Sequence, residues 1–262
     1  MDLLSWIIIF SLVGGVLSVF AASFFLLLPE TLRVRGLPHF VSFAIGALLG
    51  AAFLALLPHA MSENTKLDFH EVGMTVLVGI LVFFMLEKMV LWRHCHSDHC
   101  EAHTPHDAFE KGSQHSTVSL ILVGDGLHNF VDGILIAAAF LTDIHLGVVT
   151  SLAVAAHEIP QEVGDFAILL HSGMSRVKAL LMNILSSLST LLGALLAYFS
   201  LNELQGAIPY ILAIAASSFI YVAMADLLPG LHKKTQFFET VKQIALIVAG
   251  IATIYLAHSS LH

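Results

Sequence analysis

Long apolar stretches separated by short polar connections dominate the sequence. Each stretch is close to the roughly 20 residues that an α-helix needs to cross a bilayer. We predict eight such segments, at residues 4–28, 38–60, 71–92, 117–141, 145–171, 176–200, 206–229 and 238–258. The pattern therefore predicts an all-α membrane protein, an eight-transmembrane-helix bundle that forms a single domain over residues 1–262.

Composition supports this prediction and excludes several classes of protein. Hydrophobic residues make up 57% of the chain and charged residues only 11%, whereas soluble domains carry about 25% charged residues. The first apolar segment lacks a basic region before it and is longer than the core of a signal peptide, so we expect it to stay as a membrane helix. The net charge of −8 comes without a basic stripe, so no nucleic-acid partner is expected.

The distribution of basic residues predicts the orientation. With the N-terminus outside, the inner connections are 29–37, 93–116, 172–175 and 230–237. These connections and the helix ends beside them hold all of the 11 Lys and Arg residues except Lys66. Because basic residues concentrate on the cytoplasmic side of membrane proteins, we expect both termini to be extracytoplasmic and the connection 93–116 to be a cytosolic loop.

That loop is rich in His and Cys. The chain has 16 His and 2 Cys residues, and His is the commonest metal ligand in proteins. A reducing compartment favours free thiols or metal ligands over a disulfide. We therefore predict reversible metal capture by a group of loop side chains: His94, Cys95, His96, His99, Cys100, His103 and His106.

The fourth segment carries polar residues at helical spacing. Asp125, His128, Asn129 and Asp132 stand at positions i, i+3, i+4 and i+7, so they lie along one face of a helix. Ionisable groups inside a membrane segment are costly, at roughly 3 kcal/mol each on insertion scales. A polar stripe of this kind is therefore typical of a functional site.

The fifth segment carries a second stripe. His157 and Gln161 stand four residues apart, as do Glu158 and Glu162, and Asp165 follows one turn later. The two segments hold five carboxylates and no Lys or Arg, so the carboxylates need protons or cations. A buried polar network in which these groups satisfy one another is the alternative. Imidazole, carboxylate and amide oxygen together favour a divalent transition metal, with Zn²⁺ foremost.

Pro160 lies in the middle of the fifth segment. Because proline cannot donate to the carbonyl four residues earlier, we expect a kink in the helix beside the polar stripe. Interrupted helices at membrane depth are found where the backbone lines a polar cavity, as in transporters.

The two stripes also carry a resemblance to a known family. The runs Asp-Gly-Leu-His-Asn-Phe-Val-Asp-Gly at 125–133 and His-Glu-Ile-Pro-Gln-Glu-Val-Gly-Asp at 157–165 resemble the paired motifs of the ZIP (Zrt/Irt-like) metal transporters. They are most similar to the subgroup with the motif His-Glu-x-Pro-His-Glu. The resemblance implies a transporter that moves a divalent metal into the cytosol while one bundle of helices slides or rocks against the rest, often within a homodimer.

In the family these two helices form a binuclear metal site. The ligands implied here are His128, Asn129, Asp132, His157, Glu158 and Gln161. His128, Asp132 and His157 would form most of one site. Asn129, Asp132 and Glu158 would form the neighbouring site, so that Asp132 bridges the two.

Gln161 departs from the family pattern, because the subgroup has His at this position. Glutamine offers a neutral oxygen that needs no deprotonation. We expect this substitution to affect metal preference and the binding of two metals at once.

Further polar residues are expected along the path of the ion or behind the ligands: Asp125, Glu162, Asp165, Asn183, His59, His171 and Asp226. Each of three has a simpler alternative. His59 could anchor a helix end at the membrane interface, Asn183 could bond a neighbouring helix, and Asp226 could be merely interfacial.

The function expected is therefore transport of Zn²⁺, with Fe²⁺, Mn²⁺ and Cd²⁺ as further candidate substrates and with no catalytic cofactor. No phosphate-binding loop for ATP hydrolysis is present in the sequence. The partners expected are divalent metal ions and the lipid bilayer of the plasma membrane or a bacterial inner membrane. Protonation of the ligands would couple transport to pH.

Two alternatives remain open. His157-Glu158 begins like the HExxH motif of zinc proteases, so an intramembrane zinc metalloprotease is one of them, although Gln161 replaces the second His. An efflux carrier is the other, and the orientation and both motifs argue against it.

Overall fold

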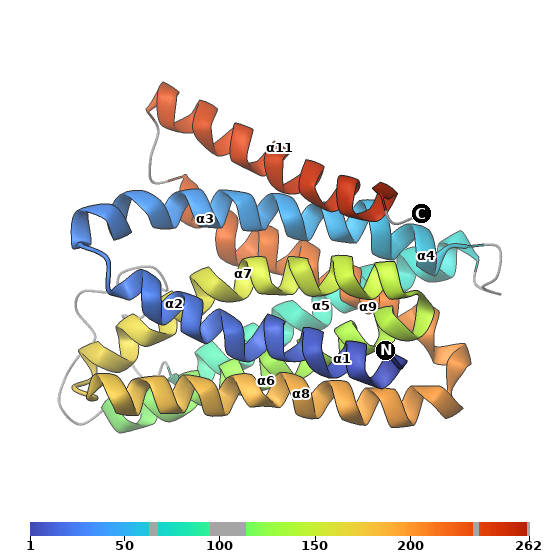
Figure 1. Ribbon diagram of the computed structural model, residues 1–262, viewed down its shortest axis with the longest axis horizontal. Helices are drawn as coiled ribbons and strands as arrows, with labels where there is room; N and C mark the ends of the chain where they lie inside the picture. The colour runs from blue at the N-terminus through green and yellow to red at the C-terminus, as the bar shows by residue number, and fades with distance from the viewer. Residues whose placement is uncertain (63–67, 95–113, 233–235, 261–262) are drawn as a thin grey trace.

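The computed structural model describes residues 1–62, 68–94, 114–232 and 236–260, and these ranges are helical without strands (Figure 1). Three stretches are π-helical (η1, η2, η4) and one is a 3₁₀ turn (η3). The elements are α1 (Leu3–Leu12), η1 (Val13–Leu17), α2 (Ser18–Leu26), α3 (Glu30–Gly50), η2 (Ala51–Leu56), α4 (Leu57–Ala60), α5 (Phe69–His94), α6 (Gln114–Thr142), α7 (Ile144–His171), α8 (Arg176–Glu203), η3 (Gln205–Ala207), α9 (Ile208–Tyr221), η4 (Val222–Leu227), α10 (Leu228–Leu231) and α11 (Phe237–Ser260).

Seven helical stretches in the described part of the chain are long and apolar enough to cross a membrane. Helix α7 is 28 residues long, about 42 Å at 1.5 Å per residue, but it is not among the seven because its second half is polar. Large apolar side chains such as Phe24, Phe199 and Leu256 lie exposed on the outside of the bundle, where lipid would cover them. The prediction of an all-α, multi-pass integral membrane protein is confirmed.

One predicted boundary was wrong. Residues 30–37 were expected to belong to an inner connection, but α3 begins at Glu30, directly after Pro29 in an extended conformation. The second span was predicted to begin at residue 38, but Pro38 lies inside α3.

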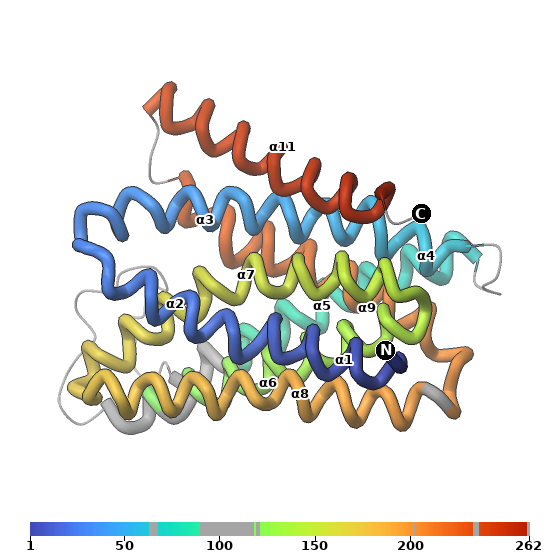
Figure 2. The backbone as a smooth tube through the Cα atoms, viewed as in Figure 1, coloured from blue at the N-terminus to red at the C-terminus, as the bar shows by residue number. Residues whose placement is uncertain are grey.

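The contacts between helices divide them into two groups, with α3 and α11 on one side of the bundle and α6 and α8 on the other (Figures 1 and 2). In the first group, α1 and α2 pack with α6, α7 and α8. In the second, α3 packs against α11, and α5 against α9. Helix α7 contacts α2 and α6 of its own group and also α3 of the other. The polar helix is therefore central, and both termini lie at the same end of the bundle.

Glycines let the helices of each group approach closely. A Cβ on Gly133 of α6 would lie 1.9 Å from the carbonyl O of Thr190 on α8, and one on Gly193 would lie 2.0 Å from the carbonyl O of Phe130. Gly46 makes a similar contact between α3 and α11. Small residues at such crossings are the usual device for packing helices in lipid.

Two of the spans contain a π-helical stretch ahead of a proline. The π-helices η2 and η4 each lead directly into a four-residue helix, with Pro58 and Pro229 at its second position. Proline removes a backbone donor from the helical ladder, and wider turns near such breaks are often found at functional sites. Pro160, in contrast, lies inside α7, which is one continuous α-helix from Ile144 to His171. The kink predicted at Pro160 therefore does not break α7 into two helices.

Candidate metal centre

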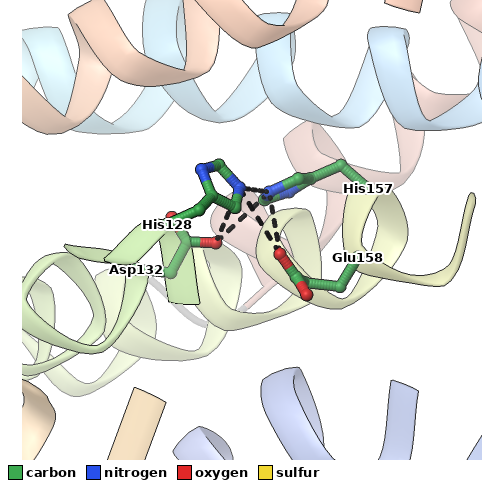
Figure 3. A group of neighbouring side chains, drawn as sticks. All are labelled: His128, Asp132, His157 and Glu158. Atoms are coloured by element: carbon green, nitrogen blue, oxygen red, sulfur yellow. Dashed lines mark hydrogen bonds and ion pairs between the residues drawn. The ribbon is translucent and has the colours of Figure 1, made fainter. Parts of the chain in front are cut away.

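Four side chains from α6 and α7 meet at the centre of the bundle (Figure 3). Nε2 of His128 lies 3.2 Å from Nε2 of His157. Oδ2 of Asp132 lies 3.2 Å from Nε2 of His157 and 3.8 Å from Nε2 of His128. Oε1 of Glu158 lies 3.4 and 3.5 Å from the same two nitrogens. We call these four residues the histidine cluster.

A backbone hydrogen bond determines the tautomer of His157. Its Nδ1 lies 3.1 Å from the carbonyl O of Ala153. A carbonyl can only accept, so Nδ1 carries the hydrogen and the neutral ring presents the lone pair of Nε2 to the cluster. This arrangement is the usual one for a metal-binding histidine.

The carboxylates of the cluster are buried with only the two imidazole rings beside them as possible partners in the described part of the chain. The side chains of Asp132 and Glu158 are 1% and 0% exposed, and none of their four oxygens has a hydrogen-bond partner in the described part of the chain. Helices α6 and α7 contain no Lys or Arg. Buried anions are strongly unfavourable without a counter-charge, so the cluster requires a cation or protons.

A second group of carboxylates adjoins the first. Asp125, Glu158 and Glu162 each offer an oxygen within 4.8 Å of the others, and we call them the carboxylate cluster. Glu158 belongs to both clusters, so it is the residue that links them here. Asp132 belongs to the histidine cluster, and the bridging role expected of it stays a prediction.

Helix α8 supplies two hydroxyl groups to these clusters. Oγ1 of Thr190 donates to Oδ1 of Asn129 at 2.7 Å, and Oγ of Ser187 lies 2.9 Å from Oε1 of Glu162. The sequence carries no signal for either residue, because Ser and Thr are ordinary packing residues in membrane helices. Only the contact between α8 and the other helices identifies them.

Phe219 of α9 closes the site from the second group of helices. Its ring is 1% exposed and makes an edge contact with His157 at 6.1 Å between centroids. The sequence did not identify Phe219 either, because a phenylalanine in an apolar span has no distinguishing pattern.

The remaining predicted residues are distributed along the bundle. Asn129 donates to Oδ1 of Asp125, a member of the carboxylate cluster, and its role as a metal ligand stays a prediction. Gln161 is half-buried on α7. Asn183 is fully buried, and its two amide atoms have no partner among the described residues. Asp165 is half-buried one turn beyond Glu162.

Three predicted residues lie apart from both clusters. His59 is in the last turn of α4, where its Nδ1 lies 2.8 Å from the carbonyl O of Ala55 and its ring contacts His258. His171 is exposed at the end of α7, and Asp226 is exposed on η4. The loop candidates Cys95, His96, His99, Cys100, His103 and His106 lie outside the described residues, as does the side chain of His94.

Comparison with known proteins places the chain in a family. Residues 92–258 match the family described as ZIP zinc transporter. The chain belongs to the ZIP family. Zinc transporter ZIP13 of Pongo abelii is 33% identical over 232 residues, covering 84% of this chain and 66% of the relative. Zinc transporter zipt-7.2 of Caenorhabditis elegans is 32% identical over 262 residues, covering 82% and 57%.

The resemblance to ZIP transporters in the two motifs is thereby confirmed. Human zinc transporter ZIP13 is 32% identical over 263 residues, covering 84% of this chain and 70% of its own length. The first two relatives are longer, and the chain spans only 66% and 57% of them. These relatives are named as transporters rather than enzymes, so the comparisons lend no support to the protease alternative.

Proposed function

We propose that this protein moves Zn²⁺ across a membrane into the cytosol and binds it at the histidine cluster. One observation carries the proposal. Two imidazole nitrogens lie 3.2 Å apart beside two buried carboxylates that have no hydrogen-bond partner among the described residues. Two nitrogens and two carboxylate oxygens are a suitable tetrahedral ligand set for zinc, and the relatives named above are zinc transporters.

The carboxylate cluster offers the ion a second, different environment. Its ligands are oxygens alone, which bind zinc less selectively than imidazole does. Because Glu158 is common to both clusters, an ion could pass between them without losing all of its protein ligands. Fe²⁺, Mn²⁺ and Cd²⁺ accept the same mixture of nitrogen and oxygen, so we propose them as further substrates.

The rest of the path follows from the positions of the polar residues. We place the end of the bundle that carries both termini outside the cell, with His59 near the entrance. Asp165, His171 and Asp226 then lie toward the cytosolic exit, beside the predicted loop 93–116. The two groups of helices would move against each other around α7, within a homodimer in the plasma membrane or a bacterial inner membrane.

Reconstitution tests this function directly. The purified protein in liposomes that enclose a zinc-sensitive dye should give zinc entry that saturates with external zinc. Liposomes without protein provide the baseline, and entry that rises linearly with zinc and matches this baseline would rule out transport. Cleavage of membrane peptides by the same preparation would instead support the protease.

Gln161→His should change which metals compete with zinc. The substitution supplies an imidazole nitrogen one turn from His157, which favours zinc over Mn²⁺ because the latter prefers oxygen ligands. Competition by Fe²⁺ and Mn²⁺ against zinc uptake measures the effect. Identical competition curves for Gln161→His and wild type would show that residue 161 does not contact the ion.

A further inference from the structure

A chain of hydrogen bonds leads from α8 to the carboxylate cluster. Oγ1 of Thr190 donates to Oδ1 of Asn129 at 2.7 Å. Nδ2 of Asn129 then donates to Oδ1 of Asp125 at 3.0 Å and to the backbone carbonyl of the same residue at 3.2 Å. Thr190 and Asn129 are almost completely buried, so water does not compete for these bonds.

Each end of the carboxylate cluster is held by one oxygen only. Oδ1 of Asp125 accepts from Asn129, whereas its Oδ2 has no partner in the described structure. Oε1 of Glu162 lies 2.9 Å from the hydroxyl of Ser187, whereas its Oε2 has no partner there either. The same hydroxyl lies 2.8 Å from the carbonyl O of Asn183, so its single hydrogen is shared between these two acceptors. The two carboxylates thus share a pattern in which one oxygen is anchored and the other is left for a ligand.

Close packing brings α8 within reach of these residues. Gly133 lets α6 approach the backbone of Thr190, as described above. From the other side, a Cβ on Gly15 of η1 would lie 2.9 Å from Oγ1 of Thr190 and 2.8 Å from the carbonyl O of Ser187. The hydroxyl of Thr190 and the backbone of Ser187 are therefore confined between neighbouring helices.

We propose that Thr190 and Ser187 are positioning residues of the metal path, which select the carboxylate oxygens that face the ion. Thr190 acts through Asn129, whose amide oxygen accepts from Thr190 and whose amide nitrogen donates to Asp125. Asn129 thereby orients Asp125, a role different from the direct ligand expected from the sequence. This inference rests on the proposed function for its biological meaning, but zinc binding alone tests it.

An ordinary contact between helices would have different consequences. Hydrogen bonds between membrane helices contribute about 0.6 kcal/mol on average, and their loss affects stability without affecting metal affinity. Residues that orient metal ligands typically change affinity or activity by about 10- to 100-fold. Affinity, measured separately from stability, therefore distinguishes the two roles.

The first test compares two nearly isosteric changes. Thr190→Val removes the hydroxyl and keeps the shape, whereas Thr190→Ser keeps the hydroxyl. Thr150→Val is the matched control, because Thr150 is also buried and its hydroxyl has no partner in the described structure. In equilibrium dialysis of the purified protein, Thr190→Val should weaken zinc binding at the carboxylate cluster about tenfold. Thr190→Ser and Thr150→Val should bind zinc like wild type.

The second test uses the other hydroxyl. Ser187→Ala should also weaken zinc binding, whereas Ser151→Ala should not, because the buried hydroxyl of Ser151 donates to the backbone carbonyl of Gly147 within its own helix. If Thr190→Val does not fold, this pair decides the question.

Two results would overturn the inference: equal affinity in Thr190→Val and Thr150→Val, or a lower melting temperature in Thr190→Val with wild-type affinity. A failure of the proposed function would give a different result: these variants would change zinc binding, but the wild-type protein would not let zinc enter liposomes.

Discussion

Replacing His157 with alanine should abolish zinc entry into liposomes. The variant loses the nitrogen that lies 3.2 Å from both Nε2 of His128 and Oδ2 of Asp132, and no described side chain can replace it at that point. Losing a group that merely supports a ligand costs about 10- to 100-fold, so we expect the loss of a ligand itself to exceed about 100-fold. Uptake rate at saturating zinc and zinc bound at equilibrium measure the effect.

Asp132→Asn tests the same centre while keeping the shape of the side chain. It should also abolish uptake, because the amide cannot supply the negative charge that a divalent ion needs. The effect of Asp132→Asn on the thermal stability of the metal-free protein is more informative than its effect on uptake. Asp132 is buried close to Glu158 with no Lys or Arg on either helix, so removing its charge should leave thermal stability unchanged or raise it.

The opposite outcome would favour a structural role. If the cluster were a network of mutually satisfied groups, Asp132→Asn would lower the melting temperature, because it would break buried bonds. His70→Ala serves as the control for loss of a histidine, since His70 is exposed near the start of α5. Uptake by His157→Ala equal to that of His70→Ala would refute the assignment of the centre.

Gly133→Ala should separate α6 from α8 and damage both stability and transport. The added Cβ would lie 1.9 Å from the carbonyl O of Thr190 and 2.8 Å from the backbone N of Ala194, so two backbones must move apart. Overpacking of this kind costs about 1–3 kcal/mol or more. The shift also displaces Thr190 from Asn129, so zinc binding should weaken together with the melting temperature in detergent.

Gly124 provides the matched control on the same helix. A Cβ at this position would meet nothing within 4 Å, and alanine is the better helix former by about 1 kcal/mol. Gly124→Ala should therefore be neutral or slightly stabilising, with unchanged uptake. Equal melting temperatures for Gly124→Ala and Gly133→Ala would show that the helices are not held at the distance seen here.

The stripes on α6 and α7 could be read from spacing alone. His128 and Asp132 stand four residues apart, and His157 precedes Glu158 on a neighbouring span. Helical periodicity puts residues four apart, such as His128 and Asp132, on one face, and the cost of charge in lipid requires that such a face be turned inward. Adjacent residues such as His157 and Glu158 do not share a face by spacing, so only the structure shows that both reach the histidine cluster. The structure brings these four side chains together, and their role as metal ligands remains a proposal.

The limits of helix α3 were harder to predict, because Pro38 resembles a helix start when only local signals are considered. In the structure it lies inside the helix that begins at Glu30. Proline within membrane helices is tolerated because neighbouring groups satisfy the freed carbonyl. Local sequence contains no information about those neighbours.

By itself the sequence determined the multi-pass, all-α class and the two polar faces, because hydropathy and helical period are properties of one segment at a time. Tertiary structure alone decided that Glu158 connects the two clusters, that Thr190 and Ser187 anchor the carboxylates, and that Phe219 covers His157. These features depend on how closely one helix approaches another. That distance is set by glycines such as Gly133, whose partners lie far away along the chain.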